Sequence, residues 1–156
     1  MGSNLSEVNI LTRREIEARI AGPLIKAFMV EFGVDRTLAV VKPVIEKLAK
    51  ESGAQAAEMA GGNSLADFVR ATSTWAAGDA YEKVVLRQTE THFDFDIKRC
   101  RYAEMYKEMG FAHLGFVLSC ARDSAMIEGF NPRMKLTRTK TIMEGSDRCD
   151  FRITLE

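Results

Sequence analysis

The sequence lacks any apolar run near the roughly 20 residues that a membrane-spanning helix needs. Its amino terminus also lacks the basic segment, apolar stretch and small-residue cleavage site of a secretory signal. It has no excess charge of either sign, because lysine plus arginine and aspartate plus glutamate both total 22. We therefore expect a cytoplasmic protein that binds neither membranes nor nucleic acid.

Cysteine and histidine are also scarce. Cys100, Cys120 and Cys149 are odd in number and widely spaced, which favours reduced thiols over a disulfide framework. No two of them have the short spacing of a zinc knuckle, so the fold itself would have to assemble any zinc site. HExxH, GxSxG and a lysine-containing phosphate loop are all absent from the sequence. The thiols thus remain open to catalysis, metal binding or packing.

The length of 156 residues predicts one domain, with residues 1–80 mainly helical and residues 81–156 mixed. Thr12 and Glu15 form a capping-box pattern at the start of a first helix, which Gly33 should end. Asp35 is expected to cap a second helix and Gly53 to end it. The expected buried faces are Ile16, Ile20, Leu24, Ala27 and Phe28 in the first helix and Leu38, Val41, Ile45, Leu48 and Ala49 in the second.

The remaining elements alternate between helices and strands. Ser64 and Asp67 should cap a third helix, and the alternation over residues 92–98 predicts a strand with one solvated face, paired with residues 84–87. Helices are expected over 101–109 and 114–127, and strands over 134–143 and 149–155. The predicted fold is therefore α+β, with N-terminal helices and a short antiparallel sheet that is covered by helices and closes with a C-terminal β-hairpin.

The predicted helix over 114–127 carries the most informative pattern for chemistry. Phe116, Cys120, Asp123 and Ile127 follow at steps of four, three and four, which places a carboxylate on a buried face. A buried charge without a partner is costly, so Asp123 must meet a cation such as Arg138, a polar network or a ligand. Cys120, one turn away, is a candidate nucleophile if its pKa is lowered, and packing is the alternative.

Three further residues lie at helix ends. Cys100 stands where a strand ends and a helix begins, and a helix amino terminus favours thiolate over thiol. Glu128 and Asn131 belong to the sequence EGFNP that closes the 114–127 helix. This segment is either an ordinary helix stop or a functional pair, since Glu128 offers a carboxylate and Asn131 both a donor and an acceptor.

Several motifs together resemble the L-2-amino-thiazoline-4-carboxylic acid hydrolase family. They are RCRYAEMY from residue 99, LSC over 118–120 with Asp123, EGFNP from 128, LTRTKTIMEG from 136 and CDFR from 149. The resemblance covers most of the chain and is densest over residues 95–152. The name of the family implies hydrolytic opening of 2-aminothiazoline-4-carboxylate to S-carbamoyl cysteine, which breaks a cyclic C–N bond.

This resemblance implies a site that holds an amidinium-like carbon, presents a nucleophile, protonates the departing ring nitrogen and binds a carboxylate. The residues that we expect in these roles are Cys120 or Cys100 as nucleophile or metal-bound thiolate, Asp123 and Glu128 as amidinium holders and proton carriers, and Arg138 as carboxylate anchor. Asn131, Tyr102 and Glu104 are further candidates for contacts with the substrate.

The closing sequence TKTIMEGSDRCDFRI is also similar to the terminal hairpin of the 4-vinyl reductase-like domain, a small-molecule-binding module. Zinc-binding members of that group carry glutamate and cysteine where Arg138 and Thr141 align here, and only Cys149 matches. The departure argues against their zinc site, although the three cysteines remain candidates for a different zinc centre. A non-catalytic binding module is therefore the alternative to a hydrolase, and methionine-rich helices with exposed stripes suggest a homodimer.

Overall fold

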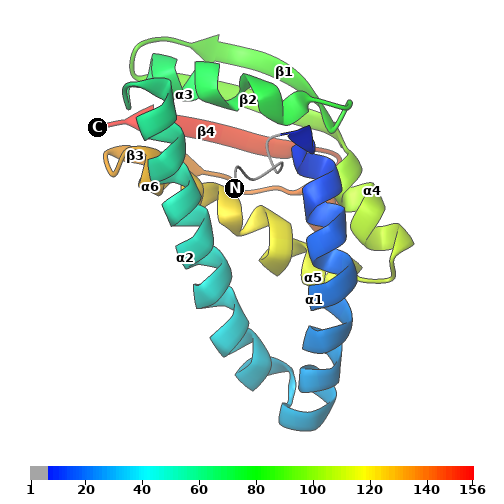
Figure 1. Cartoon of the computed structure of the whole chain (residues 1–156). Coiled ribbons are helices and arrows are strands. Elements are labelled where there is room, and N and C mark those ends of the chain that lie inside the picture. Colours follow the sequence, from blue (N-terminus) through cyan, green and yellow to red (C-terminus); the bar gives the residue numbers. More distant parts are fainter. Residues whose placement is uncertain (1–6) are drawn as a thin grey trace.

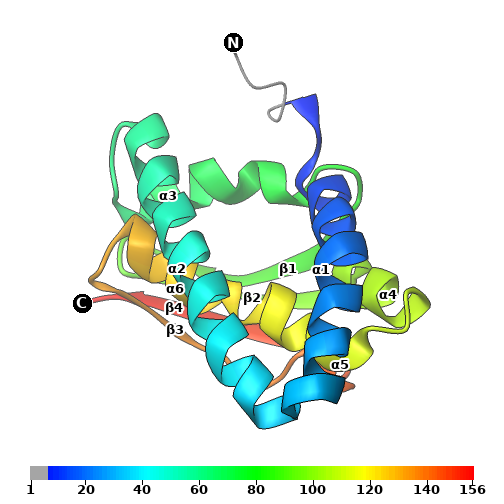
Figure 2. The same ribbon diagram turned by 60° about the horizontal axis from the view of Figure 1, so that its bottom comes forward.

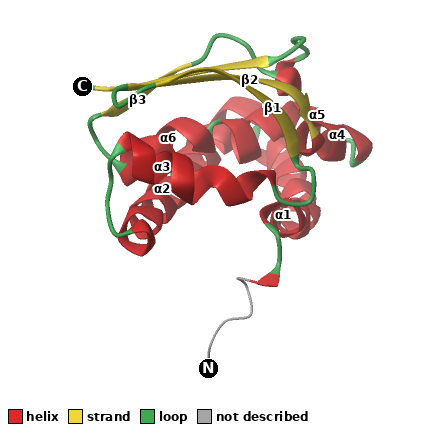
Figure 3. Ribbon diagram, turned by 90° about the horizontal axis from the view of Figure 1, so that it is seen from above, coloured by secondary structure: helices red, strands yellow, loops and turns green. Residues whose placement is uncertain are grey.

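A computed structural model describes residues 7–156 and has an α+β fold (Figure 1). Helices lie against one face of a four-stranded antiparallel sheet (Figure 3). The elements are α1 (Ile10–Phe32), α2 (Val34–Ala60), α3 (Leu65–Ala71), η2 (Thr72–Ala76), β1 (Tyr81–Gln88), β2 (His92–Cys100), α4 (Arg101–Glu108), α5 (Ala112–Gly115), η3 (Phe116–Cys120), α6 (Arg122–Phe130), β3 (Met134–Thr137), η4 (Ile142–Glu144) and β4 (Cys149–Leu155). The predicted fold class is thus confirmed.

The strand order of the sheet is β1-β2-β4-β3. The central β2–β4 pair therefore joins the two strands that come first in the sequence to the two that come last. Phe95 pairs with Phe151 and Ile97 with Cys149, and these side chains face the helices. The prediction of a solvated face on β2 holds at Lys98, which is exposed, but not at Asp94 and Asp96. Asp94 and Asp96 are only 8% and 7% exposed, because arginines from neighbouring strands cover them through ion pairs.

The first helix begins earlier than the sequence pattern suggested. Asn9, not Thr12, is its N-cap, because the Asn9 side chain accepts a hydrogen bond from the Thr12 N–H at 2.9 Å. Gly33 ends α1 as predicted. Asp35 lies in the first turn of α2 and is not its cap, while the predicted capping box of Ser64 and Asp67 is confirmed at α3.

The buried face of α1 differs from the prediction, whereas that of α2 largely matches it, since Leu38, Val41 and Ile45 pack against the core. The side of α1 that contacts the rest of the protein is formed by small residues and one isoleucine, namely Ala18, Gly22 and Ile25. The apolar stripe that we expected to be buried is 48–64% exposed, and its large members are Ile16, Ile20, Leu24 and Phe28. In α2, Leu48 is 48% exposed, whereas the adjacent Ala49 is 1% exposed. Small residues occupy most of the fully buried positions of these two helices, because they allow the helices to pack closely.

The second helix does not end at Gly53 but continues to Ala60. A Cβ atom on Gly53 would lie 2.1 Å from the Met126 carbonyl oxygen, and one on Gly129 would lie 2.0 Å from the Lys50 carbonyl oxygen. These two glycines therefore permit backbone contact between α2 and α6. Gly53, which looked like a stop signal, is instead a packing residue within the helix.

The predicted helix over 114–127 is divided by a π-helical turn, η3. The Ala121 N–H donates to the Phe116 carbonyl at 2.8 Å, which is the five-residue spacing of a π-helix. The predicted strand over 134–143 also ends early, at Thr137. After Arg138, the carboxylate of Asp150 accepts the N–H groups of residues 139 and 140, so the chain leaves the ladder.

Within residues 7–156, none of the helices combines the length and the apolar character that crossing a membrane requires.

Candidate functional site

A cavity of about 220 Å³ lies between the helices and the inner face of the sheet. Figure 2 shows that α1, α2 and the sheet surround a common centre, and residues from all of them line the cavity. Its apolar wall is formed by alanine, aromatic and aliphatic side chains, including Ala49, Trp75, Phe95, Ile97 and Phe151. Its polar wall contains Ser119, Cys120, Arg122 and Asp123 near the π-helical turn. π-Helical turns occur frequently at functional sites.

Asp123 and Arg138 form the central ion pair of the polar wall. Arg138 Nη1 donates to Asp123 Oδ2 at 2.5 Å, and Arg138 Nη2 donates to the Cys120 carbonyl at 2.9 Å. The prediction that Asp123 meets Arg138 is thus confirmed. Burial raises the pKa of Asp123, and the positive charge of Arg138 opposes this shift without cancelling it. A carboxyl group with a raised pKa is suited to carrying protons near neutral pH.

All three cysteines line the same cavity, as free thiols. Burial raises the pKa of Cys120 and of Cys149, so neither is a resting thiolate at neutral pH. Cys100 precedes α4 as predicted, and the N–H groups of Tyr102 and Ala103 stabilise its thiolate. Burial nevertheless dominates and raises the pKa of Cys100 to about 11. The helix amino terminus therefore does not activate this thiol in the free protein.

The sulfur atoms differ in their hydrogen bonds. Cys149 Sγ accepts the Ile142 N–H at 3.3 Å, whereas the Cys100 side chain makes no cap hydrogen bond to α4, although the nearby N–H groups of Ala103 and Tyr102 favour its thiolate. Among the described residues, the Cys120 sulfur has no such donor, and the residue is 9% exposed. Cys120 is the thiol whose own backbone carbonyl accepts from Arg138, the partner of Asp123.

Three of the candidate residues do not line this cavity. Glu128 is on the surface, where it pairs with Lys50 at 2.8 Å. Asn131 is buried, but its side chain donates to the Asn63 carbonyl and accepts the Arg133 N–H, so it closes the helix end. Glu104 pairs with Arg99 at 2.8 Å. The structure therefore brings together Cys100, Cys120, Asp123, Arg138 and Tyr102, and it separates the other three from them.

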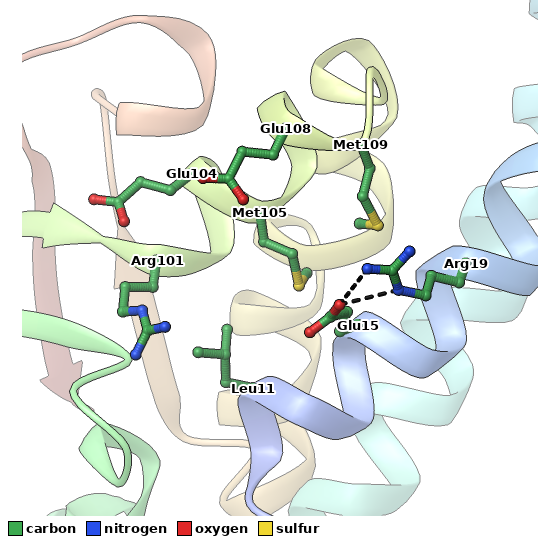
Figure 4. A pocket seen from close by; sticks show the side chains of 8 residues that line it. All are labelled: Leu11, Glu15, Arg19, Arg101, Glu104, Met105, Glu108 and Met109. Carbon is green, nitrogen blue, oxygen red and sulfur yellow. Dashed lines mark hydrogen bonds and ion pairs between the residues drawn. The ribbon is translucent and has the colours of Figure 1, made fainter.

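Glu104 instead borders a second cavity, of about 290 Å³, between α1 and α4 (Figure 4). Its charged side chains already have partners within the protein or stand at the surface: Glu15 binds Arg19 at 2.6 Å, and Arg101 donates to the Gly78 carbonyl. No thiol lines this cavity. We therefore place the candidate site in the first cavity.

The sequence interpretation missed two cavity residues, Arg14 and Arg122. Arg14 lies in the first turns of α1, and Arg122 begins α6 directly after the π-helical turn. Neither residue belongs to a motif that indicates a functional role. Arg122 is, however, adjacent to Asp123 and lies within the segment that most densely resembles the family. Across residues 7–156, no group of three or more His, Cys, Asp or Glu side chains is arranged to hold a metal ion.

Solved structures share this fold at low sequence identity. One is trafficking protein particle complex subunit 3 from Naegleria fowleri, covalently bound to palmitic acid, with TM-score 0.58, 12% identity, and coverage of 93% of this chain and 96% of that chain. Another is the phenol-responsive sensory domain of the transcription activator PoxR with phenol, with TM-score 0.55, 12% identity, and coverage of 86% of this chain and 72% of that chain. At this identity the likeness shows the fold alone.

The sequence itself identifies the family. Residues 13–153 match the L-2-amino-thiazoline-4-carboxylic acid hydrolase family, so the chain belongs to it. No curated protein matches the chain. Membership in a family named for hydrolysis supports a hydrolase role in general.

Proposed function

We propose that this protein hydrolyses a cyclic C–N bond of a small amidine or thiazoline, with 2-aminothiazoline-4-carboxylate as the first candidate substrate. Membership of the family supports hydrolysis in general. The finer proposal depends on one observation, which is that Cys120, Asp123 and Arg138 line a single cavity of molecular size. Such a wall offers a nucleophile, a proton carrier and a fixed positive charge.

In the proposed reaction, Cys120 Sγ bonds to the amidine carbon while its proton passes to Asp123. The ring C–N bond then breaks as Asp123 returns that proton to the ring nitrogen. Water adds to the same carbon and the Cys120 thiol leaves, which releases the carbamoyl product and restores the enzyme. Because burial raises the pKa of Cys120, the thiol needs this transfer, or the nearby charge of a cationic amidinium, to react as a thiolate.

A direct attack by water, assisted by Asp123, is the other route to the same product. The two routes are separated by replacing the cysteines one at a time with serine. Cys120→Ser should lower kcat at least about 100-fold if sulfur attacks. Cys149→Ser is the matched control, because that sulfur already accepts the Ile142 N–H. If all three variants retain the wild-type rate, sulfur is not the nucleophile.

The test of the overall proposal is turnover. Purified protein is incubated with 2-aminothiazoline-4-carboxylate, and mass spectrometry follows the addition of one water to form the ring-opened product. Asp123→Asn should lower the rate about 100- to 10,000-fold, the usual range for a general acid–base group. Elemental analysis of the same preparation for zinc tests the cofactor alternative.

A non-catalytic binding module is the second candidate. It is favoured by the apolar wall of the cavity and by the shared fold with proteins whose structures hold palmitic acid or phenol. Saturable binding of the thiazoline and of related cyclic amidines, without any ring-opened product, would favour this module over the hydrolase.

A further inference from the structure

The charges around the candidate site do not balance. Arg14, Arg122 and Arg138 line the cavity, whereas Asp123 is the one acidic residue among the described residues of its wall. Asp123 is already matched by Arg138, which also donates to the Cys120 carbonyl. The cavity wall thus contains two guanidinium groups beyond its internal ion pair.

Arg14 and Arg122 differ in how they are compensated. Arg14 pairs with Glu17 at 2.5 Å, and the side chain of Glu17 is 53% exposed and is not part of the cavity lining. Arg122 makes neither an ion pair nor a side-chain hydrogen bond within the described part of the chain. A guanidinium that is partly removed from water and lacks an anionic partner is costly, and a bound anion would remove that cost.

The two guanidinium groups also act on each other. Burial lowers the pKa of Arg122 and the positive charge of Arg14 lowers it further, while the charges of Glu17 and Asp123 oppose this shift without cancelling it. The group stays protonated at neutral pH, since guanidinium pKa values lie far above this range. Two like charges that face one cavity produce a positive potential, which favours an anionic ligand in the space between them.

We propose that Arg122, supported by Arg14, is the carboxylate-binding residue of this cavity, and that Arg138 is a positioning residue for Asp123 and Cys120. The ligand class is a small monocarboxylate, because a planar guanidinium binds a carboxylate through two parallel hydrogen bonds. Arg138 has already used two donors within the protein, whereas the donors of Arg122 are free. The proposal deepens the function proposed above by assigning the substrate carboxylate to α6 and α1.

Binding, measured apart from turnover, provides the test. Isothermal titration compares 2-aminothiazoline-4-carboxylate with its 4-carboxamide, in which a neutral amide replaces the carboxylate, using the wild type, Arg122→Gln, Arg122→Lys and the control Arg36→Gln, whose side chain is exposed on α2. Arg122→Gln should weaken carboxylate binding about 10- to 100-fold and leave carboxamide binding nearly unchanged. Arg122→Lys should bind the carboxylate with an affinity between those of the wild type and Arg122→Gln, and Arg36→Gln should bind it as the wild type does.

Two results would overturn this assignment. One is a wild type that binds both compounds equally well or binds neither, because then no group in the cavity selects a carboxylate. The other is an Arg122→Gln variant that is folded by circular dichroism and keeps the wild-type preference for the carboxylate. The hydrolase proposal fails separately, by absence of ring-opened product, so binding with the expected preference but without product would overturn only hydrolysis.

Discussion

Arg138 connects three parts of the cavity wall. Its guanidinium donates to Asp123 at 2.5 Å and to the Cys120 carbonyl at 2.9 Å, and it lies 5.0 Å from the centre of the Phe151 ring. Only 10% of its side chain is exposed. A lysine ammonium cannot reproduce this planar fork of donors together with stacking on a ring. The residue is therefore specified by geometry as well as by charge.

Arg138→Lys is expected to lower the free energy of unfolding by about 1–3 kcal/mol, because the Cys120 carbonyl loses its donor. Arg138→Gln should cost more, about 3–5 kcal/mol, since it removes the hydrogen-bonded countercharge of the buried Asp123 carboxylate. Urea unfolding measures both. Arg19→Lys is the control, because its ion pair with Glu15 is exposed and such pairs contribute about 1 kcal/mol or less. If Arg19→Lys lowers the free energy of unfolding as much as Arg138→Lys does, the special contribution of Arg138 is contradicted.

The raised pKa of Asp123 predicts the acid limb of the pH–rate profile. In the proposed reaction the carboxylate form accepts a proton, so activity should fall as the pH decreases through the pKa of this group. Because burial raises that pKa, half of the activity should be lost at a pH above the ordinary aspartate value of about 3.9. The positive charges of Arg138, Arg122 and Arg14 oppose this rise of the Asp123 pKa without cancelling it.

The profile of kcat/KM for the wild type and for Asp123→Asn measures this effect. The acid limb should disappear in Asp123→Asn, whose residual rate no longer depends on this carboxyl group. An acid limb that survives unchanged in the variant would assign the titration to another group.

At the scale of elements, the crossing of α2 and α6 decides where the polar wall lies. Gly53 and Gly129 remove the two Cβ atoms that would otherwise meet the backbone of the opposite helix. Since α6 carries Arg122 and Asp123, and α2 carries Ala49 and Ser52 of the cavity lining, this contact sets the width of the site.

Gly53→Ala and Gly129→Ala are each expected to lower the free energy of unfolding by about 3 kcal/mol or more, because the obstructing atoms belong to the backbone and cannot turn aside. Thermal and urea unfolding measure the change. Gly110→Ala is the control: its φ of +73° makes alanine unfavourable by about 1 kcal/mol, but no atom lies within 4 Å of the added Cβ. Equal losses of unfolding free energy at all three positions would show that the backbone conformation of glycine, and not the contact between α2 and α6, causes the loss.

Local signals predicted many of the elements but not which helix faces are buried. The capping box at Ser64, the stop at Gly33 and the pairing of Asp123 with Arg138 follow from short-range patterns and from the cost of a buried charge. The apolar stripe of α1 misled the prediction, because burial depends on which side meets another helix. The π-helical turn and the role of Gly53 likewise depend on tertiary contacts that periodicity does not contain.

Local sequence signals also predicted part of the candidate site. The placement of Cys120 and Asp123 on one buried side of a helix was predicted from their spacing, and both residues line the cavity. Glu128 and Asn131 were grouped with them because they are close in sequence. Glu128 lies on the exposed side of α6, however, where it pairs with Lys50, and Asn131 holds the loop after the helix. Arg14 comes from a distant helix and offered no signal.

At the scale of the whole molecule, α1 and α2 leave a large apolar surface exposed. It includes Ile16, Ile20, Leu24, Phe28, Val40, Val44 and Leu48, each 48–69% exposed. The charged residues along these helices form ion pairs within one helix, such as Glu15 with Arg19 and Lys42 with Glu46, so no field of one sign repels an identical copy. Surfaces of this kind usually mark a protein interface.

We predict a homodimer in which two copies of the α1–α2 pair pack against each other about a two-fold axis. Ile20→Glu and Phe28→Glu should each shift the protein to the monomer in sedimentation equilibrium, because a buried glutamate without a partner is costly. Leu86→Glu is the matched control, since Leu86 is 54% exposed but belongs to β1. A wild type that remains monomeric at about 100 μM would contradict the prediction, since it implies a Kd weaker than that of a specific dimer.

The cavity wall includes Ile10 and Arg14 near one end of the chain and Phe151 near the other. Contacts so distant in sequence form only when folding is nearly complete, which favours slow folding. A compound that binds there recognises the native state and not its partly folded precursors. Occupancy should then raise the melting temperature, and at 100 times its Kd a ligand adds about 2.7 kcal/mol to the stability of the native protein.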